Sequence, residues 1–234
     1  MSFDEEYVLL IMNCEKYRYK AEHQKESWLA NLPPDITYYH VVGNENLDTD
    51  YLFDHVNRVL TVKTMDDYNS LPKKVIASFQ AVHETFLNLK YIFKTDDDQS
   101  MTTTKFFNII TSMISVKSPK IHYGGFQVNV DTPYLSKYYL IHPELPDNII
   151  LHRTKYCSGR FYFLSNQAIV NLISKKELIG KEYLEDYAIG FYLSQYYKEN
   201  MLNIDTSKYF KDFYLDDFYL EESQGFSKSV ISLV

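Results

Sequence analysis

The sequence predicts an α/β fold in which helices cover a parallel β-sheet. Residues 7–12 form an uninterrupted apolar run, which is typical of a strand buried on both faces. Residues 70–89 place their apolar side chains at the 3.6-residue spacing of a helix. Patterns of these two kinds alternate through the first half of the chain, as expected for a parallel sheet whose strands are joined by crossover helices.

The elements of the first half follow one another with few interruptions. In chain order we expect a strand at 7–12, a helix at 16–29, strands at 36–42 and 58–62, a helix at 70–89, a strand at 91–95 and a helix at 102–114. The pair Pro33-Pro34 ends the first helix, because proline cannot continue one.

The second half changes character near residue 120, where short strands and proline-containing loops replace the regular alternation. We expect strands at 121–130, 138–141 and 160–164, and helices at 166–174 and 184–198. Residues 209–222 alternate aromatic and acidic side chains, which suits either an edge element or a docking tail. The change is a shift of composition within one fold, so we expect a single domain, 1–234, with halves of about 1–120 and 121–234.

Composition limits the classes of function. The chain has 234 residues, of which 45% are hydrophobic, and its net charge is −7. An acidic chain without a basic cluster argues against nucleic acid as a partner. No apolar stretch approaches the length of about 18 residues that a membrane span requires. The absence of a signal peptide pattern and the presence of only two cysteines, Cys14 and Cys157, favour a cytoplasmic location, which for a viral protein would be the host cytoplasm.

Three adjacent carboxylates, Asp96, Asp97 and Asp98, follow directly on the predicted strand 91–95. Alternate residues of an extended segment project to the same side, so Asp96 and Asp98 can face one site while Asp97 points away. Ligands of open α/β sheets bind at the carboxyl ends of the strands, and divalent cations prefer oxygen ligands. The triplet therefore suits a metal–diphosphate site, although a solvated acidic turn before the next helix explains it equally simply.

Several short motifs share an order and spacing that resemble the β-1,3-galactosyltransferase and Fringe-like family, glycosyltransferase family 31. Residues 91–98 resemble its apolar strand ending in K-x-D-D-D. The other matching segments are 66–74 (D-S-Y-x-N-L-T-x-K in the family), 122–125 (Y-x-G), 156–165 (Y-C-S-G-x-x-Y-V-L-S), 184–190 (L-E-D-V-x-x-G) and, more weakly, 24–28 (I-R-x-T-W). The resemblance spans about residues 7 to 200, and the common order makes it specific.

The resemblance implies a GT-A fold, with a Rossmann-like nucleotide half fused to an acceptor-binding half. It implies a UDP-sugar donor, a glycan or glycoprotein acceptor, a Mn²⁺ or Mg²⁺ cofactor, and inversion at the anomeric carbon. By the same resemblance Asp98 is the metal ligand, Asp96 contacts the nucleoside and the metal, and Asp97 orders the loop. Three further residues, Lys25, Lys74 and Gly159, are expected at the nucleotide-sugar site, with Gly159 allowing a close backbone approach beneath the sugar.

Inversion by a single displacement requires a base opposite the leaving group, which takes the proton of the acceptor hydroxyl. The resemblance assigns this role to Asp186, with Glu185 as the second candidate. An acid in the first turn of a helix also stabilises that helix through its dipole, so the position alone does not require catalysis.

The chain departs from the family pattern at two places. Family members carry a late histidine that completes the metal shell, but no histidine follows His152 here. Either Asp205, another C-terminal acid or water takes its place, or the metal is bound more weakly than is usual in the family. Arg160 and Phe161 stand where the family has small residues, and we expect Phe161 to reshape the donor pocket.

Two other classes of protein remain open. A non-catalytic module that binds a UDP-sugar or glycan could keep the fold without the full metal shell, and it would show no hydrolysis of a UDP-sugar. A nucleotidyltransferase also uses carboxylate-bound metals, but it requires a second metal-bridging acid and usually a basic or glycine-rich phosphate loop. No clear loop of this kind is present.

Overall fold

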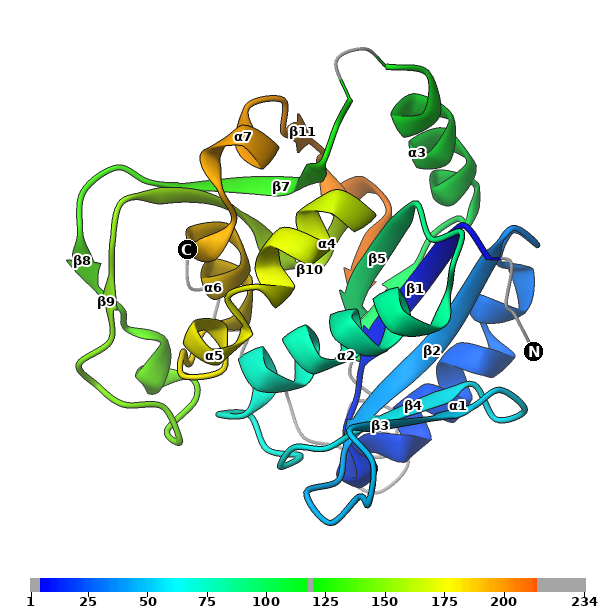
Figure 1. Ribbon diagram of the computed structural model, residues 1–234, viewed down its shortest axis with the longest axis horizontal. Coiled ribbons are helices and arrows are strands. Elements are labelled where there is room, and N and C mark those ends of the chain that lie inside the picture. The colour runs from blue at the N-terminus through cyan, green and yellow to red at the C-terminus, as the bar shows by residue number, and fades with distance from the viewer. Residues whose placement is uncertain (1–4, 118–119, 214–234) are drawn as a thin grey trace, which may run out of the picture.

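The computed structural model describes residues 5–117 and 120–213 as a mixed sheet between two layers of helices, which confirms the predicted α/β class and has the GT-A arrangement (Figure 1). Within these residues the main sheet has eight strands. Their order across the sheet is β11 (Leu202–Asn203), β7 (Tyr123–Val130), β10 (Thr154–Ser165), β5 (Tyr91–Asp96), β1 (Tyr7–Met12), β2 (Ile36–Gly43), β4 (Val59–Val62) and β3 (Tyr51–Asp54). Strands of both halves share this sheet, while the predicted division near residue 120 stays a prediction.

Helices cover both faces of the sheet. One face carries α2 (Leu71–Thr85), α4 (Asn166–Ile173), α5 (Lys176–Ile179) and α6 (Glu185–Tyr192). The other face carries α3 (Lys105–Val116) and the segment after α1 (Arg18–Glu26). Smaller elements complete the described fold: η1 (Glu15–Tyr17), η2 (Leu29–Asn31), η3 (Tyr138–Leu140), α7 (Gln195–Lys198), η4 (Thr206–Lys208), and the two-stranded pairs β6 (Gln99–Met101) with β12 (Phe210–Asp212) and β8 (Tyr134–Leu135) with β9 (Ile150–Leu151).

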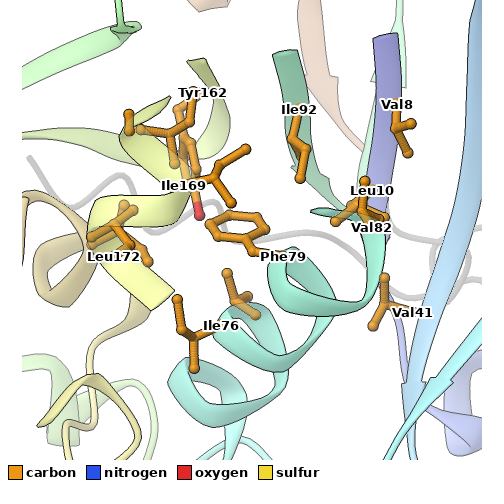
Figure 2. Packing of buried hydrophobic residues seen from close by; sticks show 14 of the residues in the cluster. Val8, Leu10, Val41, Ile76, Phe79, Val82, Ile92, Tyr162, Ile169 and Leu172 are labelled. Atoms are coloured by element: carbon orange, nitrogen blue, oxygen red, sulfur yellow. The ribbon is translucent and has the colours of Figure 1, made fainter. Parts of the chain in front are cut away.

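The apolar run of β1 is buried on both faces, as the sequence predicts. Val8 and Leu10 pack into the cluster under α2, whereas Leu9 and Ile11 pack into the opposite cluster. Figure 2 shows Phe79 of α2 inserted between the sheet and α4. Burial of each such side chain contributes about 1.5–3 kcal/mol, so the two clusters together fix the position of the strand.

The strand directions bring several strand ends to one edge of the sheet. The strands β1, β2, β4 and β5 are mutually parallel, and Met12 at the end of β1 pairs with Asp96 at the end of β5. The neighbouring strand β10 runs antiparallel to β5, and its register against β7 shifts between Cys157 and Tyr162. Because a bulge of this kind re-aims the backbone, the carbonyl groups of Gly159 and Arg160 lie against Lys94 and Thr95 near the carboxyl end of β5.

Most predicted elements are confirmed, but two expectations are wrong. Residues 138–140 form the short helix η3 rather than part of a strand. The expected helix 184–198 is interrupted at Leu193 and Ser194, where extended backbone separates α6 from α7. The sequence pattern also missed β6, since a strand of three residues carries too little periodicity.

Residues 209–222 were expected to form either an edge element or a docking tail, and the structure describes the first part of this segment. Residues 210–212 form an edge strand on β6, and residues 214–222 lie outside the described residues. Across residues 5–117 and 120–213, none of the helices combines the length and the apolar character that crossing a bilayer takes.

Candidate active site

Four segments distant in sequence meet at the carboxyl end of β5. The acidic triplet leaves β5 at Asp96, beside the end of β1. The bulge of β10 brings Gly159 to the same place, and the first turn of α6 brings Glu185 and Asp186. This is the edge at which open α/β sheets bind their ligands.

Lys94 is the centre of this arrangement. Its Nζ lies 2.7 Å from Asp96 Oδ1 and 3.0 Å from Glu185 Oε2, and it donates a hydrogen bond of 3.0 Å to the carbonyl oxygen of Gly159. The side chain is 1% exposed. Burial works against the charged form, but the two carboxylates outweigh it and hold the pKa of Lys94 above its ordinary value. The lysine therefore stays charged and fixes both carboxylates.

Glu185 is enclosed by its partners. One carboxylate oxygen accepts the hydroxyl hydrogen of Tyr162, and the other pairs with Lys94. The residue is 4% exposed, and burial raises its pKa while Lys94 opposes the rise. Both oxygens are thus engaged within the protein, away from an incoming acceptor.

Asp186 lies next to Glu185 but is more open. Its Oδ2 accepts a 3.0 Å hydrogen bond from the backbone N–H of Gly159, and its Oδ1 accepts one of 2.7 Å from that of Tyr187. Burial raises the pKa of Asp186, while Lys94 and the two N–H groups oppose the rise. The result is an oriented carboxylate that retains lone pairs and a raised affinity for a proton, as general-base catalysis requires.

The peptide groups of Gly159 connect the two ends of the site. The N–H of Gly159 binds Asp186, and its carbonyl binds Lys94, which in turn holds Asp96. A Cβ at position 159 would lie 3.4 Å from Asp96 Oδ2 and 3.7 Å from Asp186 Cβ. Glycine therefore leaves open the space between these two carboxylates.

The three carboxylates of the triplet differ in their charge partners. Asp96 pairs with Lys94, and Asp97 pairs with Lys20 at 3.3 Å. Burial is the main cause that raises the pKa of Asp96 and of Asp97 to about 6. Asp98 forms no ion pair among the described residues, although its charge interacts with that of Lys20, and its Oδ1 accepts a 2.9 Å hydrogen bond from Gln99 Nε2. Of the three carboxylates, that of Asp98 is therefore the least engaged by a cation of the protein.

Of the described acids beyond residue 200, Asp212 is the one that contacts the segment of the triplet. Gln99 Nε2 donates to Asp212 Oδ1 at 3.0 Å as well as to Asp98, and Arg160 Nη2 pairs with the same oxygen of Asp212 at 2.7 Å. Asp205 is exposed instead, and its described partners are Ser207 and Lys208. Within the described residues no three acidic, histidine or cysteine side chains converge as a complete metal-ligand set.

Lys74 reaches the ends of two neighbouring strands. Its Nζ donates to the carbonyl oxygen of Asn13, which follows β1, and to Asp66 Oδ1, both at 2.7 Å. Asp66 in turn accepts the N–H of Gly43 at the end of β2. Asn13 is 4% exposed, and its Nδ2 has no hydrogen-bond partner among the described residues. These buried groups join the ends of β1 and β2 beside the triplet, where a nucleoside is expected, and the unpartnered Nδ2 of Asn13 is itself enclosed by the protein.

Lys25 is placed differently from the other expected site residues. It pairs with Glu22 one turn away on α1. Its neighbour Gln24 reaches the triplet, where Nε2 donates to the carbonyl oxygens of Asp97 and Gln99 at 3.0 and 2.9 Å. The weak motif at 24–28 thus lies beside the site, and it contacts the triplet segment through the side-chain amide of Gln24 rather than through Lys25.

The expectation that Phe161 reshapes the donor pocket is wrong. Its side chain is completely buried and packs on the rings of Phe93, Phe106 and Phe210 in the core. Successive residues of a strand point to opposite faces, so Arg160 extends to the site while Phe161 points inward. The unusual residue that changes the site is Arg160.

Three tyrosines lie near Asp186, and sequence reasoning did not single them out as site residues, although Tyr68 and Tyr156 belong to the matching segments 66–74 and 156–165. Burial, and next the charge of Asp186, raise the pKa of Tyr68, Tyr138 and Tyr156. Tyr68 stacks on His142 with ring centroids 4.1 Å apart. Aromatic faces combined with hydroxyl groups suit contact with a sugar ring.

The chain also has a cavity of about 400 Å³ between the edge strand β3, α2 and α5, away from this site. Its lining includes Lys63, Lys73, Lys176 and Lys181 but none of the expected site residues. The candidate active site is therefore defined by its convergent polar side chains and not by the volume of a cavity.

Comparisons with known proteins agree with this geometry. A family model described as "Galactosyltransferase" matches residues 22–200. A UDP-GalNAc:beta-1,3-N-acetylgalactosaminyltransferase 1 of Mus musculus is 26% identical over 144 residues, which is 60% of this chain and 40% of that protein. The Homo sapiens protein of the same name is 24% identical over 146 residues, covering 62% and 43%. The chain thus spans about two fifths of the length of these curated relatives.

Among solved structures, the chain is similar to a glycosyltransferase involved in the glycosylation of the major capsid of PBCV-1. The two are 13% identical with a TM-score of 0.50, and the match covers 86% of this chain and 83% of the other. At this identity the likeness shows the shared fold and nothing about the substrate.

Proposed function

This chain belongs to the galactosyltransferase family, and we propose that it transfers a hexose from a UDP-sugar to a hydroxyl group of a glycan or glycoprotein, with inversion at the anomeric carbon. The observation that carries the proposal is the link through Gly159. One residue joins the expected base, Asp186, to the lysine that holds the D-x-D carboxylate Asp96. Base and donor site are thereby kept in a fixed relation, as a single displacement requires.

The donor half of the proposal rests on the polar groups at the carboxyl ends of β1, β2 and β5. The nucleoside is expected beside the Lys74–Asp66 pair, in which Asp66 is the more exposed partner. Asp98, which forms no ion pair among the described residues, is the proposed ligand of a divalent cation, with the remaining ligands expected from the diphosphate and water. Such a cation, Mn²⁺ or Mg²⁺, would offset the charge that develops on the departing UDP.

The catalytic half rests on Asp186. Its two backbone hydrogen bonds orient the carboxylate, and its raised pKa increases its affinity for the proton of the acceptor hydroxyl. Glu185 is held by Lys94 and Tyr162, so the geometry favours Asp186 over Glu185 as the base. Glu185 instead orients Lys94, and through it the D-x-D carboxylate.

The acceptor is expected on the side of Asp186 that carries Tyr68, Tyr138 and Tyr156. An acceptor sugar that stacked there would present a hydroxyl to Asp186 while the donor lay across Gly159. We propose a carbohydrate acceptor on this basis.

The decisive experiment is a release assay. The chain is incubated with individual UDP-sugars, a panel of glycan acceptors and Mn²⁺, and UDP release and product mass are measured. Acceptor-dependent UDP release that Asp186→Asn abolishes supports the proposal. Binding of UDP-sugars without any release, by hydrolysis or transfer, would support the non-catalytic binding module. Pyrophosphate release from a nucleoside triphosphate and a sugar phosphate would support the nucleotidyltransferase.

A further inference from the structure

We propose that Asp212 and Arg160 are donor-binding residues that exchange partners: Asp212 leaves Arg160 for the divalent cation held by Asp98, and Arg160 turns to the diphosphate of the donor. In the structure the two residues pair with each other. The inference rests on the proposed use of a UDP-sugar with a cation.

The position of Asp212 beside Asp98 carries the first half of the inference. Both carboxylates accept hydrogen bonds from the same nitrogen, Gln99 Nε2, at 3.0 and 2.9 Å. The two hydrogens of an amide nitrogen diverge by about 120°, which places the two oxygens about 5 Å apart. Two oxygens on one small divalent cation lie about 3–4 Å apart, since each bond is about 2.0–2.2 Å. A side-chain movement of about 1–2 Å therefore brings both onto one cation.

The backbone holds Asp212 at this place. The strand β12 pairs with β6 directly after the triplet, with Asp212 opposite Gln99. The N–H of the next residue, Phe213, donates to the carbonyl oxygen of Asp98, and the Phe213 ring stacks on His23 at 4.3 Å. Backbone hydrogen bonds thus join Asp212 to the segment that carries the triplet, so rotation of a side chain is enough to bring its carboxylate toward Asp98.

The backbone of Arg160 is held by a hydrogen bond, whereas its guanidinium group is partly exposed to solvent. Its carbonyl oxygen accepts a 2.6 Å hydrogen bond from Thr95 Oγ1, which fixes the bulge of β10 beside the triplet. The side chain is 30% exposed and that of Asp212 is 42% exposed. Ion pairs with this much water around them are weak, so the pair opens at little cost when either partner finds a stronger one.

Each residue has a stronger partner once the donor is bound. A carboxylate binds a divalent cation more strongly than it binds a solvated guanidinium, and a guanidinium forms paired hydrogen bonds with phosphate oxygens. The exchange also balances charge locally, because the cation joins two carboxylates while Arg160 joins the diphosphate. When donor and cation are absent, Arg160 neutralises the charge of Asp212, so this carboxylate is not left unpaired.

The test uses the opposite signs that the exchange predicts for two variants of one ion pair. Free Mn²⁺ is measured by electron paramagnetic resonance, first with protein alone and then with UDP added. Asp212→Asn should weaken Mn²⁺ binding in the presence of UDP about tenfold or more, because it removes a ligand. Arg160→Gln should tighten binding of Mn²⁺ alone, because it removes the competitor for Asp212, and should weaken UDP binding at saturating Mn²⁺.

Glu6→Gln is the matched control, because it breaks the exposed Glu6–Lys90 pair, which precedes β1 and β5 at the ends opposite the triplet, and it should leave Mn²⁺ binding unchanged. If the pair had a purely structural role, both substitutions would change the affinity for Mn²⁺ in the same direction. That result would overturn the inference. If Asp212→Asn does not fold, Arg160→Gln decides alone, and unchanged or weaker binding of Mn²⁺ without UDP overturns it.

The outcome separates this inference from the proposed function. If wild-type UDP binding depends on Mn²⁺ and on Asp98 but not on Asp212, the inference fails and the proposed function stands. If wild-type protein binds UDP equally well with Mn²⁺ and with a chelator, the cation-assisted function fails and the exchange fails with it.

Discussion

Lys94 and Glu185 form a buried ion pair, with Nζ 3.0 Å from Oε2 and both side chains almost completely enclosed. The pair joins the end of β5 to the first residue of α6. Because the D-x-D triplet follows Lys94 and the expected base follows Glu185, this contact sets the distance between the donor site and the base. It is the structural reason to treat Lys94 as a positioning residue.

Replacing Lys94 with methionine tests this role. Lys94→Met leaves the buried carboxylate of Glu185 without its cation and deprives Asp96 of the same partner. We expect a loss of about 3–5 kcal/mol in the free energy of unfolding, as for other broken buried pairs. Equilibrium unfolding in urea measures it. The double variant Lys94→Met/Glu185→Gln should recover about 1–3 kcal/mol, because the stranded charge is gone.

The control for this prediction is Lys105→Met, at an exposed position of α3. It should change the free energy of unfolding by less than about 0.5 kcal/mol. A Lys94→Met variant as stable as this control would show that Lys94 does not hold the two carboxylates.

Asp186→Asn should lower kcat by about 10²–10⁴-fold, because the amide cannot accept the proton of the acceptor. Affinity for the UDP-sugar should stay within about threefold, since the base acts in the transition state. Asn offers one acceptor oxygen where Asp186 uses two, so the melting temperature is measured alongside the rate. Asp147→Asn, at an exposed position, is the matched control. Retention of more than half the activity by Asp186→Asn would remove Asp186 as the base.

Affinity for UDP should depend on a divalent cation and on Asp98. Calorimetric titration with Mn²⁺ should give tighter binding than titration with EDTA, and Asp98→Ala should remove the difference. Asp97→Ala should have a smaller effect, because Asp97 already pairs with Lys20. Equal sensitivity of the two variants would contradict the distinct charge partners that the structure gives them.

As the pH is lowered, kcat should begin to fall at a pH above the ordinary aspartate pKa of about 3.9. Burial raises the pKa of Asp186, so the carboxylate takes up its proton at a higher pH than a solvated aspartate does. Activity is therefore lost as the pH falls through the raised value, and it returns as the pH rises. The measurement is kcat under saturating donor, cation and acceptor at each pH. A kcat that stays constant down to about pH 4 would sink the prediction.

Gly190→Ala should destabilise the protein by about 1–3 kcal/mol, through overpacking between α6 and β10. A Cβ at position 190 would lie 2.1 Å from Tyr156 Cβ and 2.7 Å from Tyr156 Cα, and backbone cannot yield easily. Because α6 carries Asp186, kcat should fall as well. Gly180→Ala is the comparison, since its nearest neighbour would be the Lys176 carbonyl oxygen at 3.2 Å. Urea unfolding that ranks the two variants equally would refute the packing argument.

The alternation of apolar runs and helical periods was sufficient to predict the class of fold and most of the long elements. Both signals are local, because a strand buried on two faces and a helix buried on one each require a particular spacing of apolar residues. The same logic placed the carboxylates Asp96 to Asp98 at a strand end. Short elements such as η3 and β6 were not predicted, because three residues have no period to detect.

The sequence by itself therefore determined the α/β class, the position of the acidic triplet at the end of β5 and the acids in the first turn of α6. The tertiary structure alone decided which charged groups meet. It enclosed Glu185 between Lys94 and Tyr162, turned Phe161 into the core, and brought Asp212 to the triplet while Asp205 stayed with Lys208. Pairings between distant residues depend on how layers of the fold pack and where strands shift register, and no local spacing of residues encodes either.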